Sequence, residues 1–260
     1  MTDLSAVQRR TIAVLSVGQV LGGISFGATV SLGAVLAAHL SGSDALSGLA
    51  TAAITLGTAL TAVPLAALAR RWGRRPALAT GMTVALVGVG LVIAAVAGHA
   101  FALLLTGFVL IGAGQAANLQ SRFAAADLAT DASRGRDLSI VVWTTTIGAV
   151  LGPNLVGPGE VVGAAVGMPP LTGAYVFTVV AQLAGIVLYL VALRPDPLLL
   201  AQRVVAAHDA AAARIACADR PVAARYATFA IVGAHGVMVS IMAMTPVHLL
   251  HHGATLTIVG

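Results

Sequence analysis

The stretch "RRWGRRPAL", residues 70–78, places four arginines within six positions between two long apolar segments. Only 9% of the chain is charged and 58% is hydrophobic, so this concentration of basic charge stands out. The mean hydropathy is +0.97, and apolar stretches near the roughly 20 residues that a helix needs to cross a bilayer recur along the chain. The composition therefore predicts an all-α membrane protein in which the arginine cluster separates two spanning helices.

Seven apolar segments of spanning length follow one another. They cover residues 12–38, 46–69, 77–97, 101–123, 138–160, 171–193 and 227–249. An eighth apolar run starts at Ala254, and a polar stretch separates the sixth segment from the seventh. We therefore expect a six-helix transmembrane bundle over residues 1–193 and a cytoplasmic linker of helical propensity over 194–225. Residues 226–260 are predicted to form a seventh helix and the start of an eighth.

All the basic residues fall on one side of this topology. The chain has 14 of them, every one an arginine. They lie before the first segment, between the second and third, around the end of the fourth, and between the sixth and seventh. Because cytoplasmic loops carry the excess of positive charge, the amino terminus and the linker are predicted to be cytoplasmic. The absence of lysine and the abundance of alanine and glycine suggest a bacterial source, hence a multi-pass protein of the inner membrane.

Several other classes of protein fit the sequence poorly. A pI near 10.6 is compatible with nucleic-acid binding, but the arginines lie between apolar runs without a stripe of stacking aromatics, so we expect no nucleic-acid partner. The single cysteine, Cys217, excludes an internal disulfide and a cysteine-based zinc site. No acid, nucleophile and base converge in the spans. We therefore expect neither an enzyme, nor a metal centre, nor a cofactor.

The arginine-rich turn resembles the signature that the major facilitator superfamily of transporters carries between its second and third helices, Gly-x-Leu-Ala-Asp-Arg-x-Gly-Arg-Lys/Arg followed by leucine. The matching residues are Leu68, Ala69, Arg71, Gly73, Arg74, Arg75 and Leu78. Two positions depart: Ala66 replaces the glycine and Arg70 replaces the aspartate.

The departure at Arg70 bears on the role of the turn. In the family, the aspartate joins a charge network that latches the two halves of the transporter on the cytoplasmic face. A latch in this chain therefore needs another acid, and Asp127, Asp131 and Asp137 are the candidates. We assign Arg71, Gly73, Arg74, Arg75 and Asp127 to a cytoplasmic gate motif. The alternative is that the arginines only fix the topology and bind anionic lipid headgroups.

A second resemblance lies in the fifth segment. The stretch "GAVLGPNLVG", residues 148–157, is similar to the antiporter motif of the same superfamily, Gly-x-x-x-Gly-Pro-x-x-Gly-Gly. Gly148, Gly152, Pro153 and Gly157 match, and Val156 replaces the first glycine of the final pair. Glycines at this spacing permit close helix contact, and proline bends a membrane helix. The resemblance implies an exporter that works by exchange; a generic packing kink is the alternative.

Few polar residues lie inside the predicted spans. Gln19, Gln115, Asn118 and His235 are the candidates for lining a substrate cavity. For the two residues of the fourth segment, hydrogen bonding between helices is an equal alternative. Phe108 stands where the family often carries an arginine linked to proton movement. His235 falls near mid-depth of the seventh segment, and an ionisable group there is a candidate proton carrier, with neutral packing as the alternative.

The resemblance covers the amino-terminal half of the superfamily fold plus its seventh helix. Complete members have twelve or fourteen spans, so it implies a truncated or split transporter. We expect a secondary transporter that exports small apolar compounds across the inner membrane by alternating access, with the lipid bilayer, a small-molecule substrate and protons as its partners. The alternatives are a truncated non-transporting membrane protein, a half-transporter that needs a separately encoded second half, and a nutrient importer.

The arginine distribution predicts the side of the membrane on which each loop lies, and reporter fusions measure it. Fusions after Arg75, Arg136 and Ala211 should report the cytoplasm, and fusions after Gly42, His99 and Gly167 should report the periplasm. The expectation follows from the exclusion of positive charge from translocated loops. One fusion that reports the opposite side would contradict the arrangement of six spans plus one.

Overall fold

A computed structural model describes residues 4–130, 132–207, 225–226, 228–234 and 237. The chain divides into two compact units, residues 1–204 and 205–260. The first unit contains the helical bundle, and the fold and sites below belong to it. Most of the predicted seventh segment, with His235, lies outside the described residues.

The described residues form helices and no strands, as the sequence predicts. In chain order the elements are α1 (Leu4–Ser41), a short 3-10 turn (Asp44–Leu46), α2 (Gly48–Trp72), α3 (Arg74–Ala97), α4 (Phe101–Ala126), α5 (Arg134–Asn154), α6 (Val156–Ala165), α7 (Tyr175–Ala192) and α8 (Pro197–Ala207). Five of the described helices are long and apolar enough to cross a membrane. The pair α5 and α6, bent by 53°, supplies a sixth crossing if it is counted as one broken span.

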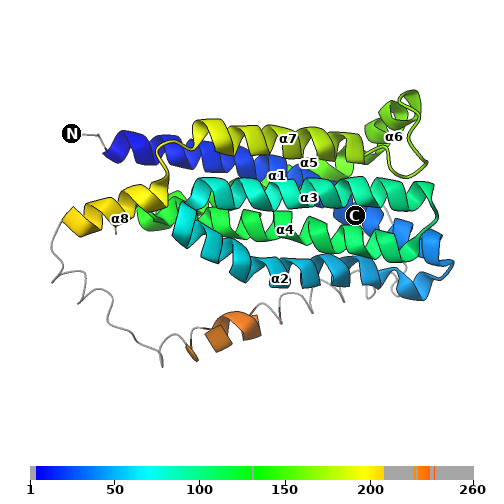
Figure 1. Ribbon diagram of the computed structural model, residues 1–260, viewed down its shortest axis with the longest axis horizontal. Coiled ribbons are helices and arrows are strands. Elements are labelled where there is room, and N and C mark those ends of the chain that lie inside the picture. Colours follow the sequence, from blue (N-terminus) through cyan, green and yellow to red (C-terminus); the bar gives the residue numbers. More distant parts are fainter. Residues whose placement is uncertain (1–3, 131, 208–224, 227, 235–236, 238–260) are drawn as a thin grey trace, which may run out of the picture. The chain divides into compact units, whose positions relative to one another are not determined.

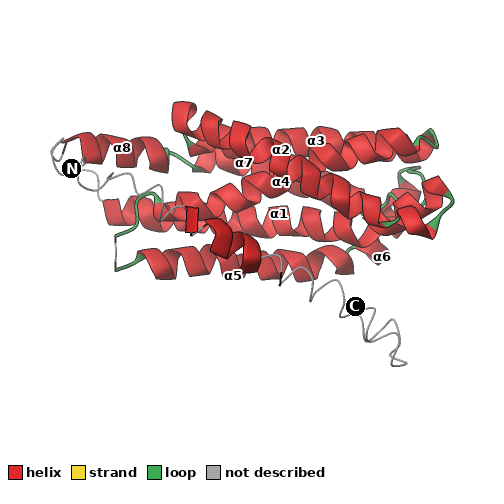
Figure 2. Cartoon of the chain, turned by 90° about the horizontal axis from the view of Figure 1, so that it is seen from below, coloured by secondary structure: helices red, strands yellow, loops and turns green. Residues whose placement is uncertain are grey.

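The long helices of the bundle lie side by side and alternate in direction (Figures 1 and 2). Pairs of contacts give the directions. Gly18 and Ser25 of α1 meet Tyr189 and Gln182 of α7, so α1 and α7 are antiparallel. Thr58 and Ala62 of α2 meet Gly112 and Gln120 of α4, so α2 and α4 are parallel. The start of α1, the α2–α3 turn, the start of α5 and the α7–α8 connection meet at one end, and α6 lies at the other. The arginine-bearing connections within the unit therefore share one end, which we call the arginine-rich end.

Helices α1 and α5 pack closely because glycines of one helix lie against glycines of the other. A Cβ atom built on Gly148 would lie 2.8 Å from the Cα of Gly23, and one built on Gly152 would lie 2.7 Å from the carbonyl oxygen of Ile24. Gly27 faces Gly152 one turn further along. The two backbones thus touch along one face of each helix, which is the close approach that small residues at four-residue spacing permit in membranes.

The central helix α4 makes similar contacts with its two neighbours. A Cβ atom on Gly112 would lie 2.7 Å from the carbonyl carbon of Gly57 in α2. On another face of α4, a Cβ atom on Gly107 would lie 2.9 Å from the carbonyl oxygen of Gly88 in α3. The bundle is therefore held by backbone contact at several crossings, with large apolar side chains such as Phe108 and Leu104 buried between them.

The predicted fifth span, 138–160, is not one straight helix. Pro153 occupies the last turn of α5, and the chain bends by 53° before α6 begins at Val156. Proline has no N–H to donate and its ring crowds the preceding turn, so a continuous helix is disfavoured there. Beyond the bend, the carboxylate of Glu160 accepts hydrogen bonds from the backbone N–H groups of Leu171 (3.1 Å) and Gly173 (3.0 Å), which ties the following loop to α6.

Two glycines of the "GAVLGPNLVG" stretch occupy different environments, and this difference can be measured. Gly152→Ala brings a methyl group against the backbone of α1, where no side chain can move aside, so we expect a loss of about 1–3 kcal/mol of stability. Gly157→Ala is the matched control, because a Cβ atom there meets nothing within 4 Å. Thermal unfolding of the purified chain in detergent measures both. Equal stability of the two variants would contradict the backbone contact between α1 and α5.

Candidate functional site

The α2–α3 turn depends on the backbone conformation of Gly73. Its N–H donates to the carbonyl oxygen of Ala69 (2.8 Å), which ends α2, and its φ of 97° lies where only glycine is unstrained. A Cβ atom there would also lie 2.5 Å from the carboxyl carbon of Asp196. Conformation and space therefore both require glycine, and α3 starts at the next residue, Arg74.

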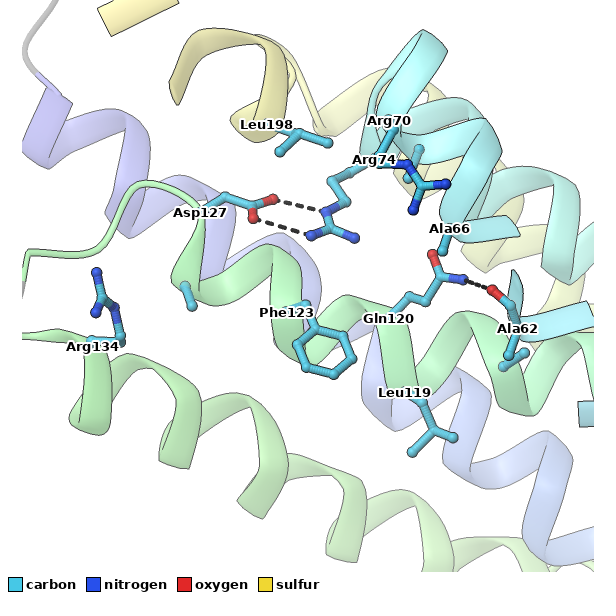
Figure 3. A pocket seen from close by; sticks show the side chains of 13 residues that line it. Ala62, Ala66, Arg70, Arg74, Leu119, Gln120, Phe123, Asp127, Arg134 and Leu198 are labelled. Atoms are coloured by element: carbon cyan, nitrogen blue, oxygen red, sulfur yellow. Dashed lines mark hydrogen bonds and ion pairs between the residues drawn. The ribbon is translucent and has the colours of Figure 1, made fainter. Parts of the chain in front are cut away.

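Arg74 forms a two-point ion pair with Asp127. Its Nε donates to Oδ2 at 2.8 Å and its Nη2 donates to Oδ1 at 3.1 Å. The two side chains are only 13% and 11% exposed. Paired, charge-assisted hydrogen bonds that are shielded from water are stronger than ordinary surface ion pairs. The pair joins the start of α3 to the residue that follows α4 (Figure 3).

The other two candidate acids, Asp131 and Asp137, are not seen paired with the arginine-rich turn in the described residues. Asp137, in the first turn of α5, is only 1% exposed and accepts a hydrogen bond from Gln8 of α1 at 2.9 Å. It also pairs with its neighbour Arg136 at 3.2 Å. Asp131 lies outside the described residues. Among the candidate acids in the described residues, Asp127 is thus the one that bonds to an arginine of the turn.

A further acid at this turn was not predicted. Asp196, between α7 and α8, accepts the backbone N–H of Arg75 at 2.8 Å through Oδ2. Its Oδ1 accepts the N–H groups of Leu198 (3.1 Å) and Leu199 (3.3 Å). One carboxylate therefore caps the first turns of both α3 and α8, where the positive helix dipoles favour an anion. The Asp-Pro pair at the start of α8 is a recognisable capping signal; the contact with α3, far away in sequence, carries no such signal.

The remaining arginines of the turn face different surroundings. Arg70 and Arg71 are exposed, and Arg75 is half-buried with an Nε that has no hydrogen-bond partner among the described atoms. Arg70 and Arg74 line a cavity of about 660 Å³ at the arginine-rich end, together with Arg134 from the start of α5. Figure 3 shows these side chains around one space.

The floor of this cavity is apolar and is formed by α2 and α4. Small alanines line both helices, and the larger Leu119 and Phe123 of α4 are 38% and 62% exposed. Gln120 lies beneath them and donates from Nε2 to the carbonyl oxygen of Ala62 at 3.1 Å. The cavity thus combines an apolar trough with a cationic rim, and among the described residues that line it Asp127 is the one acid.

Gln19, a predicted cavity residue, is fully buried and connects three helices. Its Nε2 donates to the backbone oxygen of Asn118 at 2.7 Å and to the hydroxyl of Ser121, both in α4. Its Oε1 accepts from the hydroxyl of Thr145 in α5 at 2.9 Å. The amide is therefore fully engaged between α1, α4 and α5, and Gln19 lines neither this cavity nor the smaller one described below.

The structure places two other predicted cavity residues together. Gln115 and Asn118 line a small internal space between α1, α3, α4 and α7, apart from the arginine-rich end. Gln182 of α7 lines the same space and was not singled out from the sequence. In the sequence, Gln182 is a lone polar residue in an apolar helix. This is a signal that could have singled it out, but it does not indicate which residues lie opposite. His235 lies outside the described residues.

The double cap formed by Asp196 can be tested by graded substitution. Asp196→Ala leaves two helix starts without an acceptor, and we expect a loss of about 2 kcal/mol, at about 1 kcal/mol for each cap. Asp196→Asn keeps one oxygen and should lose about half of that. Ser47→Ala is the matched control, since Ser47 precedes α2 without making a cap bond. Unfolding in detergent measures all three, and a fully stable Asp196→Ala variant would contradict the cap.

The sequence of the chain is similar to those of known transporters. Residues 15–260 match the family model described as Major Facilitator Superfamily. The uncharacterized MFS-type transporters YdeG and YddS of Bacillus subtilis are 38% and 35% identical over 98% and 97% of this chain. The chain spans about three fifths of their length, 60% and 59%.

Two further similarities are more distant or more local. The riboflavin transporter RfnT of Brucella anthropi is 38% identical over 60% of this chain and 39% of its own length. The crystal structure of the human organic anion transporter MFSD10 (TETRAN) superposes with a TM-score of 0.55 at 21% identity, over 73% of this chain and 48% of that one. The second likeness concerns the fold alone. By its family match and by its close relatives, the chain is a multi-pass membrane protein that belongs to the Major Facilitator Superfamily.

Proposed function

We propose that the chain provides the first bundle of a secondary transporter that exports small apolar compounds across the inner membrane in exchange for protons. The observation that carries the proposal of export is the α1–α5 contact with the break that follows it. Gly148 and Gly152 bring α5 against α1, and Pro153 lies directly before the 53° bend. This is the region that resembles the superfamily's antiporter motif.

In this proposal the ion pair between Arg74 and Asp127 acts as a gate at the cytoplasmic end, with the amino terminus in the cytoplasm. The pair lines the 660 Å³ cavity and is largely shielded from water. Alternating access requires contacts that hold one end closed and can be exchanged for others when that end opens. A two-point ion pair meets this requirement, because its partners can be resolvated when the cavity fills with water.

Proton coupling requires a side chain that can gain and lose a proton inside the membrane. Residues 45–126 contain no aspartate or glutamate, so α2, α3 and α4 carry no acid. The acids Asp127, Asp137 and Asp196 flank the helices at the arginine-rich end. We therefore assign proton transfer to His235, because histidine is the side chain best suited to gain and lose a proton near neutral pH.

One observation favours a second candidate function. The riboflavin transporter RfnT aligns with 60% of this chain at 38% identity. Riboflavin combines a planar aromatic ring system with polar edges and a chain of hydroxyl groups, and its ring faces are the part that suits an apolar surface. Import of such a compound is compatible with the same apolar trough, so the direction of transport has to be measured together with the substrate.

Transport assays with gate variants test the proposal. Everted membrane vesicles that contain a full-length transporter with this chain as its first bundle should accumulate a lipophilic fluorescent dye when a proton gradient is imposed. Asp127→Asn should reduce the rate roughly tenfold, since hydrogen bonds to charged groups contribute about 1.5–3 kcal/mol. The reversed pair, Arg74→Asp with Asp127→Arg, should recover part of the loss. Ser47→Ala serves as the control, because Ser47 makes no side-chain cap bond and belongs to neither motif, and it should transport at the unmodified rate.

The same preparation separates the alternatives. Uptake of riboflavin by intact cells, with no dye transport in everted vesicles, would replace export by import. Absence of both activities, while the protein remains folded in the membrane, would contradict transport by this chain and favour the non-transporting alternative. An Asp127→Asn variant with the full rate would remove the gate from the proposal and leave transport intact.

A further inference from the structure

A second cavity lies inside the bundle, where α1, α3, α4 and α7 meet. It is lined by polar side chains from three helices, Ser25 of α1, Gln115 and Asn118 of α4, and Gln182 of α7, and by the sulfur-containing Met82 of α3. The space open to the centre of a water molecule is about 10 Å³. A cavity needs about 10–15 Å³ by this measure to hold one water. The space therefore suits a single water molecule and is too small for a transported compound.

Gln182 has one hydrogen-bonding atom that the protein leaves without a partner. The residue is 3% exposed, and its Nε2 donates to the hydroxyl oxygen of Ser25 at 3.0 Å. Its Oε1 is buried and accepts no hydrogen bond from any described atom. A buried acceptor left in this condition is unfavourable, because it has lost its hydrogen bonds to water and has gained none from the protein.

Other groups around the space can complete the coordination of a water molecule. The side-chain amide of Asn118 lies against Gly22, where a Cβ atom would lie 2.5 Å from its Nδ2, so the missing side chain of Gly22 makes room for it. Ser25 is 2% exposed and contributes a hydroxyl group. A buried water needs two to four polar partners, and the amides and the hydroxyl that line this cavity supply that number.

The surrounding surface of α7 has the same polar character. Tyr175 and Thr178 share a helix face with Gln182; the hydroxyl of Tyr175 interacts with Thr29, and that of Thr178 is buried without a bonded partner among the described atoms. Residues three, four and seven apart lie on one face of a helix. The face that α7 turns inward is therefore polar along two turns and short of hydrogen-bond partners, which favours hydration over a dry apolar contact.

We propose that this cavity binds one ordered water molecule, which donates a hydrogen bond to Oε1 of Gln182 and bonds to the side chains of Asn118 and Ser25. The water links α7 to α1 and α4. Because the backbone oxygen of Asn118 already accepts from Gln19, and Gln19 accepts from Thr145, the link extends to α5. A hydrogen-bonded chain then crosses four helices of the bundle. The site is independent of whether the protein exports or imports.

X-ray radiolytic labelling of the purified chain in detergent tests this site, because irradiation produces hydroxyl radicals from bound as well as bulk water. Met82 is the reporter: it lines the cavity and is 3% exposed. We expect rapid oxidation of its sulfur under irradiation but slow oxidation by added hydrogen peroxide, which has to enter from outside. Gln182→Leu, which removes the acceptor and fills the space, should lower the radiolytic labelling of Met82 several-fold.

The matched control is Gln120→Leu. Gln120 is also a buried glutamine with one Oε1 lacking a partner, but it lies at the other cavity. This variant should leave the labelling of Met82 unchanged. Unmodified protein in which Met82 resists radiolysis would overturn the proposal, as would equal labelling in the Gln182→Leu variant. A variant that fails to fold is recognised by fast peroxide oxidation of Met82, and in that event the unmodified protein decides the question.

Discussion

The contact of one helix backbone against another, made possible by glycine, is the constraint on which the rest of the bundle depends. In a lipid environment the burial of apolar side chains does not drive helices together, since lipid tails are equally apolar. Close packing and hydrogen bonds have to supply the association. The pairs Gly23 with Gly148 and Gly57 with Gly112 permit that closeness, so that α1 meets α5 and α2 meets α4. The polar residues then find partners across short distances, as Gln19 does.

The arginine-rich end shows how a charge pattern can be kept while its members change. The superfamily signature expects an acid at the position of Arg70, and this chain has a fourth arginine in its place. Two acids from elsewhere meet the turn instead. Asp127 pairs with a guanidinium of the turn, and Asp196 binds the backbone at the start of α3. The carboxylates that contact the turn thus come from other segments of the chain, while the turn itself keeps the glycine that its backbone requires.

Much of the fold was predictable from the sequence, because apolar segment length and arginine placement are local signals. The spans, the turn at Gly73 and the bend near Pro153 all follow from residues that are neighbours in sequence. The candidate site was predictable only in part. Asp127 was singled out through a resemblance, whereas Asp196 and Gln182 act through residues more than a hundred positions away. A single sequence carries no local signal for such contacts, and the burial of Gln19 likewise depends on what lies opposite it.

The position of Asp196 also has a consequence for the order in which the protein is made. The acid lies 121 residues after Arg75, whose N–H group it accepts. During synthesis α4, α5, α6 and α7 are therefore all added before the carboxylate that caps the first turn of α3 is made. The arginine-rich turn belongs to the part of the bundle that is completed last, when the segment after α7 leaves the ribosome and folds back against it.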